Sequence, residues 1–157
     1  MPDTADTDIF QRFLADLQAL PSRSRLDQAD TEAIYALAYQ QAVHGHFDTA
    51  YRYFSLLTLY RPTELKYLAG LALSYKMLQE YANAIGVYAY MALLEADEPE
   101  HQLSIAECLL QQGKADEARE TLDLVTRFCA ENSGHEKAGE RAKAITALLS
   151  SRVGDVA

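Results

Sequence analysis

A pattern of small and large apolar residues that recurs every 34 positions constrains this chain of 157 residues more than any other feature. The residues that follow this step are Ala38, Ala72 and Ala106, then Ala50, Ala84 and Ala118, then Leu37, Leu71 and Ile105, and finally Phe54, Tyr88 and Leu122. Small residues allow two helices to cross closely, and large apolar residues beside them fill the space between neighbouring helices. The pattern therefore predicts three copies of one helical hairpin, stacked side by side.

A period of about 34 with these residue types is typical of the tetratricopeptide repeat. We predict an all-α protein in which three such repeats, at 31–64, 65–98 and 99–130, stack as a short superhelix. An N-terminal amphipathic helix and a linker (1–30) precede the repeats, and a C-terminal capping helix with a tail (131–157) follows them. All regular structure is expected to be helical, in eight helices.

Capping and turn residues set the expected helix boundaries. Asp30 or Thr31 is expected to cap the first repeat helix, which runs to about residue 44. Further helices are expected at 47–60, 64–78, 81–94, 100–112, 115–130 and 135–152. Gly45 and Gly113 occupy the same inter-helix turn, where a left-handed backbone favours glycine. The second repeat has Gln79 there, so its turn must bear strain or take another form.

The segment before the repeats carries an apolar row that needs a partner. Its members, at helical spacing, are Ile9, Phe10, Phe13, Leu14, Leu17 and Leu20. The row stops at Pro21, and residues 21–30 show no clear periodicity, as in a linker. This helix can dock on its own chain or on a second copy. We take Phe10, Phe13, Leu14 and Leu17 as candidate dimerisation residues.

Composition excludes several classes of function. A net charge of −9 and a pI of about 4.8 argue against nucleic acid as a partner, because its backbone needs a basic surface. No apolar stretch approaches the roughly 20 residues that span a bilayer, so no membrane insertion is expected. The first eight residues are polar and acidic, unlike a signal peptide, which favours the cytoplasm. Cys108 and Cys129 lack a C-x-x-C spacing and are expected to be free thiols.

No group of residues has the spacing of a catalytic or metal site. His44 and His46 flank Gly45, but no third ligand lies nearby in the sequence. The acidic run 95–100 lacks the alternating oxygen ligands and the central glycine of a calcium loop. Burial raises the pKa of a thiol, so Cys108 on a packed helix is not expected to act as a nucleophile. Phosphate-loop and hydrolase motifs are absent from the sequence. We therefore expect no enzyme, no cofactor and no metal.

Tyrosine is unusually frequent in this chain, with ten residues, whereas tryptophan is absent from the sequence. Tyr75, Tyr81 and Tyr88 lie where the repeat pattern places packing aromatics. Tyr35 and Tyr39 lie four residues apart on a different side of the first repeat helix, away from Leu37 and Ala38. Those two are expected to face the second helix of the repeat. The side that carries Tyr35 and Tyr39 lines the concave groove of stacked repeats.

Extending this side through the repeats predicts a binding groove. Its candidate residues are Tyr35, Tyr39, Ala42, Val43, Lys66, Ala69, Leu73, Lys76, Met77, Leu103, Glu107, Leu110 and Gln111. Such an apolar and aromatic surface suits an extended peptide with spaced apolar anchors. The two lysines can meet the carbonyl or acidic groups of that peptide. The alternative is that the N-terminal helix covers this surface.

Three stretches carry a resemblance to a known family. They are 106–114 (AECLLQQGK) preceded by Glu98-Pro99, 34–39 (IYALAY) continuing through Gly45, Phe47, Ala50 and Phe54, and Tyr81 followed by Ala84-Ile85. Together they resemble the class II chaperones of bacterial type III secretion, which hold translocator proteins, and the likeness spans residues 10–149. An unrelated tetratricopeptide protein would share Ala50 and Ala84 but need not share the AECLLQQG run.

The resemblance implies a cytoplasmic bacterial chaperone whose groove takes an extended, proline-containing segment of a hydrophobic translocator. It also implies an N-terminal helix that often mediates a weak homodimer. The chain departs from the family at Gln79, which replaces a turn glycine, and at Ala42, where the family often has an aromatic residue. Two other functions remain open on the sequence: a generic tetratricopeptide scaffold and a co-chaperone for the needle subunit.

Overall fold

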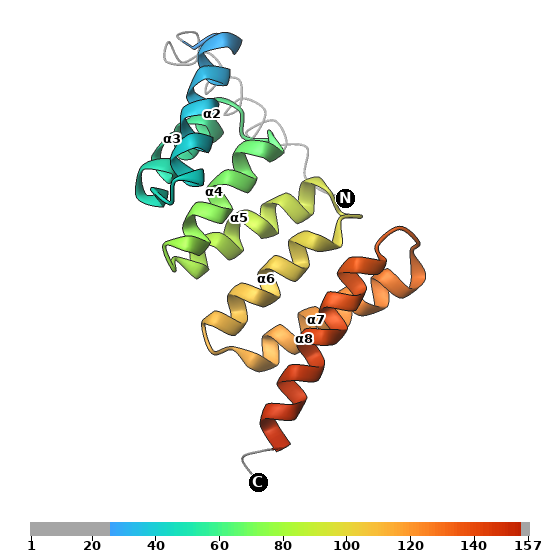
Figure 1. Cartoon of the computed structure of the whole chain (residues 1–157). Helices are drawn as coiled ribbons and strands as arrows, with labels where there is room; N and C mark the ends of the chain where they lie inside the picture. Colours follow the sequence, from blue (N-terminus) through green and yellow to red (C-terminus); the bar gives the residue numbers. More distant parts are fainter. Residues whose placement is uncertain (1–25, 155–157) are drawn as a thin grey trace, which may run out of the picture.

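The computed structural model describes residues 26–154, which form seven α-helices and no strand (Figure 1). The helices are α2 (Gln28–Val43), α3 (Phe47–Tyr60), α4 (Leu65–Met77), α5 (Tyr81–Leu94), α6 (Pro99–Gln111), α7 (Ala115–Glu131) and α8 (Glu136–Gly154). The all-α prediction is confirmed, and α3 and α5 have the predicted bounds. The predicted N-terminal helix, with Phe10, Phe13, Leu14 and Leu17, lies outside the described residues.

The first repeat helix starts earlier than predicted. Its cap is Asp27, whose side chain accepts a hydrogen bond from the backbone N–H of Asp30 at 2.8 Å. The Asp30 side chain in turn accepts from the backbone N–H of Asp27 at 3.1 Å. This reciprocal pair satisfies two N–H groups at the helix end, and it makes Asp30 the third residue of α2. The prediction that Asp30 or Thr31 caps the helix was therefore wrong.

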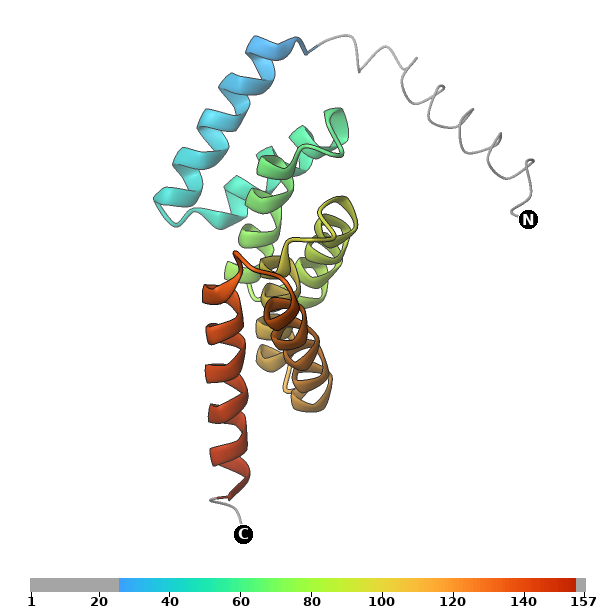
Figure 2. The same ribbon diagram turned by 90° about the vertical axis from the view of Figure 1, so that its right-hand side faces the viewer.

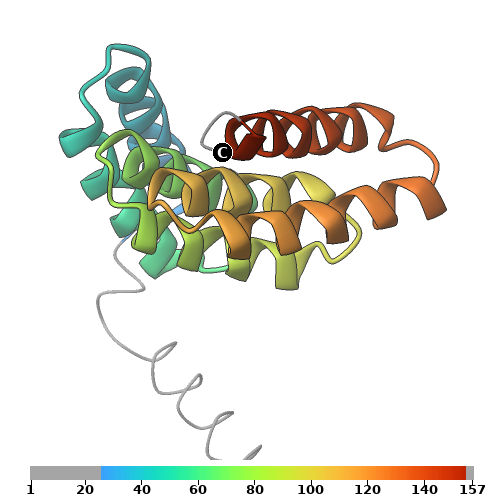
Figure 3. The ribbon, with the colours of Figure 1, turned by 90° about the horizontal axis from the view of Figure 1, so that it is seen from below.

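Consecutive helices pack against one another, so the helices succeed each other along the stack from α2 to α8. α2 and α8 stand at opposite ends of the stack, on the same side of it (Figure 2). Seen from below, α8 lies along α6 and α7 (Figure 3). The alanines of the 34-residue pattern are all fully buried: Ala38, Ala50, Ala72, Ala84, Ala106 and Ala118. The predicted helix crossings are confirmed.

Leu37 is an exception to the pattern of burial. Its counterparts Leu71 and Ile105 are buried, because α4 and α6 each pack on the second helix of the preceding repeat. Leu37 is 47% exposed, since no helix precedes α2 within residues 26–154. The prediction that Leu37 faces the second helix of its own repeat was wrong.

The turns inside the three repeats, between α2 and α3, α4 and α5, and α6 and α7, each contain one residue with a left-handed backbone. Gly45 has φ 79°, Gly113 has φ 76°, and Gln79 has φ 62°. The left-handed region costs a residue with a Cβ atom roughly 1–2 kcal/mol. The middle turn therefore keeps the geometry of the other two and bears the strain that the sequence predicts.

None of the helices within residues 26–154 combines the length and the apolar character needed to cross a membrane.

Candidate peptide-binding groove

An apolar pocket of about 460 Å³ opens between α2 and α4 on the side predicted to form the groove. Seven of the predicted groove residues line it: Tyr35, Tyr39, Ala42, Val43, Lys66, Ala69 and Leu73. The remaining lining residues are Phe47, Phe54 and Gly70. We call this the first pocket. Its walls come from two neighbouring repeats, so an extended segment that lies across both repeats contacts it.

Aromatic rings hold the first pocket in shape. The ring centroid of Tyr35 lies 6.3 Å from that of Tyr39, 6.1 Å from that of Phe54 and 5.5 Å from that of Tyr67. Lys66 places its Nζ 5.0 Å from the ring centroid of Tyr35 and 5.3 Å from that of Tyr67. A cation over an aromatic face is attracted by the electron density of the ring. The pocket is thus a packed aromatic wall with one positive charge at its edge.

Gly70 lets the Phe54 ring reach the first pocket. A Cβ atom at residue 70 would clash with three ring carbons of Phe54. Phe54 comes from α3, behind α4, and is almost fully buried. Neither residue was predicted from the sequence to be part of the pocket. A glycine inside a helix is itself a signal of close approach between elements, and it could have identified this contact.

The third repeat does not continue the open groove in the way predicted. Leu103, which is equivalent to Tyr35 and Ala69, is fully buried in a cluster with Ala106, Leu122, Val125 and Ala142. Ala142 belongs to α8, which packs over this part of α6 and α7. Leu103 is therefore a core residue, and its assignment to the groove surface was wrong. Met77 is exposed but lies outside the lining of the first pocket.

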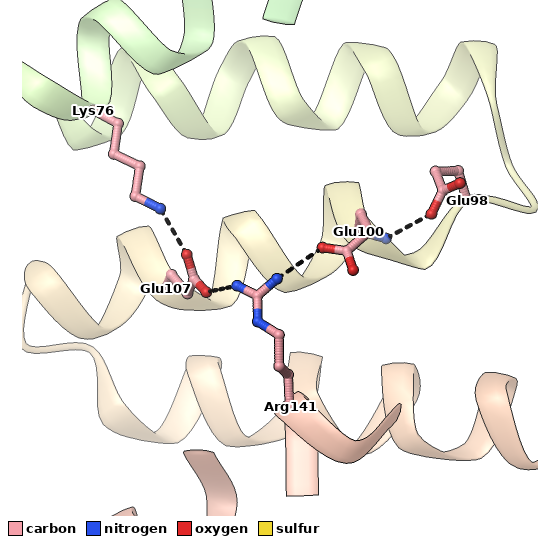
Figure 4. Close-up of polar contacts among 5 residues, drawn as sticks. All are labelled: Lys76, Glu98, Glu100, Glu107 and Arg141. Atoms are coloured by element: carbon pink, nitrogen blue, oxygen red, sulfur yellow. Dashed lines mark hydrogen bonds and ion pairs between the residues drawn. The ribbon is translucent and has the colours of Figure 1, made fainter. Parts of the chain in front are cut away.

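Glu107 joins three helices through ion pairs (Figure 4). Lys76 of α4 donates a hydrogen bond of 2.6 Å from Nζ to Glu107 Oε2. Arg141 of α8 donates from Nη2 to Glu107 Oε1 and, over 3.0 Å, from Nη1 to Glu100 Oε2. We call Lys76, Glu107, Arg141 and Glu100 the ion network. Arg141 could not be predicted as a partner of Glu107 from the sequence, because its helix lies outside the repeat pattern.

The ion network changes the predicted role of one lysine. Burial alone would lower the pKa of Lys76, but the hydrogen bond and the negative charge of Glu107 outweigh it and raise the pKa above its usual 10.5. Lys76 is thus already bound to Glu107 of its own chain. Within the described part of the chain, Lys66 forms no ion pair and is the groove lysine open to a ligand.

The other residues considered for chemistry take structural positions. The rings of His44 and His46 stack with centroids 6.4 Å apart at the first turn. Within residues 26–154, no group of three or more His, Cys, Asp or Glu side chains could hold a metal ion. Cys108 and Cys129 are free thiols, as predicted. Burial raises the pKa of both. A raised pKa leaves less thiolate at neutral pH, the opposite of an activated nucleophile.

Comparison with known proteins assigns the family. Residues 31–63 and 77–128 each match a tetratricopeptide repeat family. The low calcium response locus protein H of Yersinia pestis is 27% identical over 143 residues, covering 88% of this chain and 85% of that protein. The crystal structure of SycD from Yersinia enterocolitica, a type III secretion chaperone, in complex with a peptide of the translocator YopD matches with a TM-score of 0.70. It is 25% identical and covers 82% of this chain and 98% of that one.

PcrH of Pseudomonas aeruginosa is more similar to this chain in sequence than SycD is. Its crystal structure in complex with the chaperone binding region of PopD is 30% identical, with a TM-score of 0.70. The match covers 82% of this chain and 96% of PcrH. Three observations agree on one family. They are the identity at this level over nearly the whole of PcrH, the shared repeat fold and the apolar first pocket. The chain therefore belongs to the class II translocator chaperones of type III secretion.

Proposed function

We propose that this protein binds an extended apolar segment of a hydrophobic translocator in its concave groove, and so keeps the translocator soluble and competent for secretion. The observation that carries the proposal is the first pocket, an aromatic cavity shared by two repeats of a chain in this chaperone family. Within the bacterial cytoplasm the protein acts by binding and not by catalysis.

The geometry of the first pocket supports this mode of binding. Tyr35 packs against Phe54 and against Tyr67 within the chain itself, so little of its side-chain freedom is lost on binding. Apolar side chains of the segment are buried against Tyr39 and Leu73, and Lys66 faces a carbonyl or an acidic group beside them. A translocator with its apolar segment covered in this way does not aggregate through that segment.

The test is a titration of a labelled peptide with the sequence of the PopD region that PcrH binds. Tyr39→Ala is expected to weaken binding by more than about 1 kcal/mol, because aromatic anchors dominate such interfaces. Tyr39 is 58% exposed, so the substitution leaves the fold intact. The matched control is Leu59→Ala, which removes a side chain that is 75% exposed and lies outside the first pocket. Equal affinity in the unaltered chain and both variants contradicts the proposal.

Self-association through the N-terminal segment is part of the proposed function. Phe10, Phe13, Leu14 and Leu17 form an apolar row that suits a second copy of the chain. Deleting residues 1–21 is expected to shift the protein towards monomer in sedimentation equilibrium. If the full chain is already monomeric at high concentration, the segment instead docks on its own chain and the dimer proposal fails.

A further inference from the structure

The outer side of α5 carries no charged side chain. Of the seven helices within residues 26–154, α5 (YANAIGVYAYMALL) is the one without Asp, Glu, Lys or Arg. A helix at a protein surface normally turns charged residues towards water, and a helix that is apolar all round is usually buried. Yet α5 has a row of exposed residues at helical spacing, which we call the outer row. Its members are Ala82, Gly86, Ala89, Tyr90 and Leu93.

Gly86 gives the outer row a shape that the chain itself does not use. In α4, Gly70 makes room for the Phe54 ring. At residue 86, by contrast, a Cβ atom would meet no other group within 4 Å. Glycine weakens a helix relative to alanine, and it suits positions where another backbone approaches closely. The open space over Gly86, flanked by the small side chains of Ala82 and Ala89, fits a helix of another molecule.

An apolar pocket of about 390 Å³ lies beside the C-terminal end of α5. Its lining includes Ala92 of α5, Pro99 of α6, and Leu124 and Phe128 of α7. We call it the outer pocket. Leu93, which follows Ala92, is 80% exposed. The outer row and the outer pocket share no residue with the lining of the first pocket, so they form a separate apolar surface.

Acidic side chains border this surface. Glu120 lies one helix turn before Leu124 on α7, and Asp123 lies directly before it. Asp97 lies in the loop between α5 and α6, which also lines the outer pocket. These three carboxylates are exposed and outnumber the exposed Arg127 near them. A second copy of this chain, with its net charge of −9, would bring an acidic border of its own, so the charge favours a partner with Lys or Arg.

We propose that the outer row and the outer pocket bind an amphipathic helix of a partner protein. This helix has small and leucine-sized residues along its apolar side and Lys or Arg at its edges. Its small residues pass over Gly86, one larger residue enters the outer pocket, and its cations face Glu120 and Asp123. The inference goes beyond the proposed function, because the partner is a protein other than the client. A client in the first pocket leaves this surface free.

The test titrates the full chain with a labelled synthetic helix of about 18 residues, with Ala and Leu along one side and Lys at the edges of that side. A peptide of the same composition in scrambled order is the control for charge alone. The ordered peptide is expected to bind at least about tenfold more tightly, because it alone presents a continuous apolar side. Replacing its Lys residues by Glu is expected to abolish binding, since the border of the surface is acidic.

Leu93→Asp separates apolar docking from attraction by charge. Attraction by charge alone would grow with the added carboxylate, whereas loss of the leucine contact is expected to weaken binding of the ordered peptide about tenfold. Leu59→Asp is the matched control, because Leu59 holds the same repeat position on α3 and is 75% exposed. It is expected not to weaken binding. Gly86→Leu is expected to weaken binding without lowering the melting temperature, since its side chain enters open space.

The other outcomes overturn the proposal. Equal binding of the ordered and scrambled peptides, stronger binding by Leu93→Asp, or no binding by the unaltered chain would each exclude an apolar helix site on α5. A change in the sedimentation of the full chain by Leu93→Asp, without binding of the ordered peptide, would make the surface an interface between copies. Tyr39→Ala is expected to weaken only the PopD-region peptide and Leu93→Asp only the synthetic helix, so each proposal can fail while the other stands.

Discussion

The two halves of the concave face use the same repeat positions in opposite ways. In the first and second repeats, Tyr39 and Leu73 stand open at the first pocket. The equivalent residue of the third repeat is Glu107, which is bound to Lys76 and Arg141. At the neighbouring position, Tyr35 lines the pocket, whereas Leu103 is fully buried under α8.

The difference teaches that a repeat position fixes which side of a helix a residue occupies, while its neighbours decide whether a ligand can reach it. α8 packs on α6 and α7 and covers the third repeat, and within the described residues nothing plays that part for α2. Each end of a solenoid needs its own solution for the face it leaves open. Within residues 26–154, one end is covered by α8, and the other leaves Leu37 of α2 exposed.

The largest expected effect separates the two halves directly. Leu103→Ala leaves a cavity in a closed cluster and is expected to lower the free energy of unfolding by about 2–5 kcal/mol. Leu73→Ala, at an exposed groove position, is expected to change it by less than about 0.5 kcal/mol. Urea denaturation of both variants measures the contrast. Equal losses of stability would show that α8 does not close the third repeat.

A pair of helical glycines tests how the open half is built. Gly70→Ala is expected to destabilise by about 1–3 kcal/mol, because its Cβ atom must displace the buried Phe54 ring. Gly86→Ala is the control, since a Cβ atom there meets no other group within 4 Å. This second change is expected to stabilise α5 by about 0.5–1 kcal/mol, the usual gain of alanine over glycine in a helix. Thermal melts that shift in the same direction for both would refute the proposed close contact.

The turn between α4 and α5, inside the second repeat, offers a way to raise the stability of the open half. Gln79→Gly is expected to stabilise the protein by roughly 0.5–1 kcal/mol, because glycine adopts the left-handed backbone without the cost that glutamine bears. Gln112→Gly, at a right-handed helix end, is the control and is expected to bring no gain. A destabilised Gln79→Gly variant would mean that the glutamine side chain contributes more than its backbone costs.

The smallest effect concerns the ion network and its dependence on pH. Because the folded pKa of Lys76 is raised, its stabilising contribution is fully present below the unfolded value of about 10.5 and is lost as the pH rises through the folded value. Lys76→Met removes this dependence. Above about pH 10.5 the variant is expected to lose less stability than the unaltered chain, with a difference of less than about 1 kcal/mol. Parallel pH profiles of the variant and the unaltered chain would show that the pair contributes nothing.

Much of this architecture could be predicted from the sequence, because it depends on local patterns. The recurring alanines located the helix crossings, and glycine and proline signals located most helix ends. Leu37 and Leu103 could not be placed correctly, since their exposure depends on which helices pack at the ends of the stack. Arg141 follows no repeat pattern, so its pairing with Glu107 becomes visible only when α6 and α8 are brought together.

The position of α2 has a consequence for how the protein moves. α2 ends the described stack and packs mainly on α3 and α4. A terminal unit of a solenoid separates at lower free energy than an internal one, so amide hydrogens of α2 should exchange faster than those of α6. The first pocket spans α2 and α4, so a ligand there ties the loose end to the stack and slows this exchange. Binding of the client thus makes α2 open together with the rest of the stack, and no longer on its own.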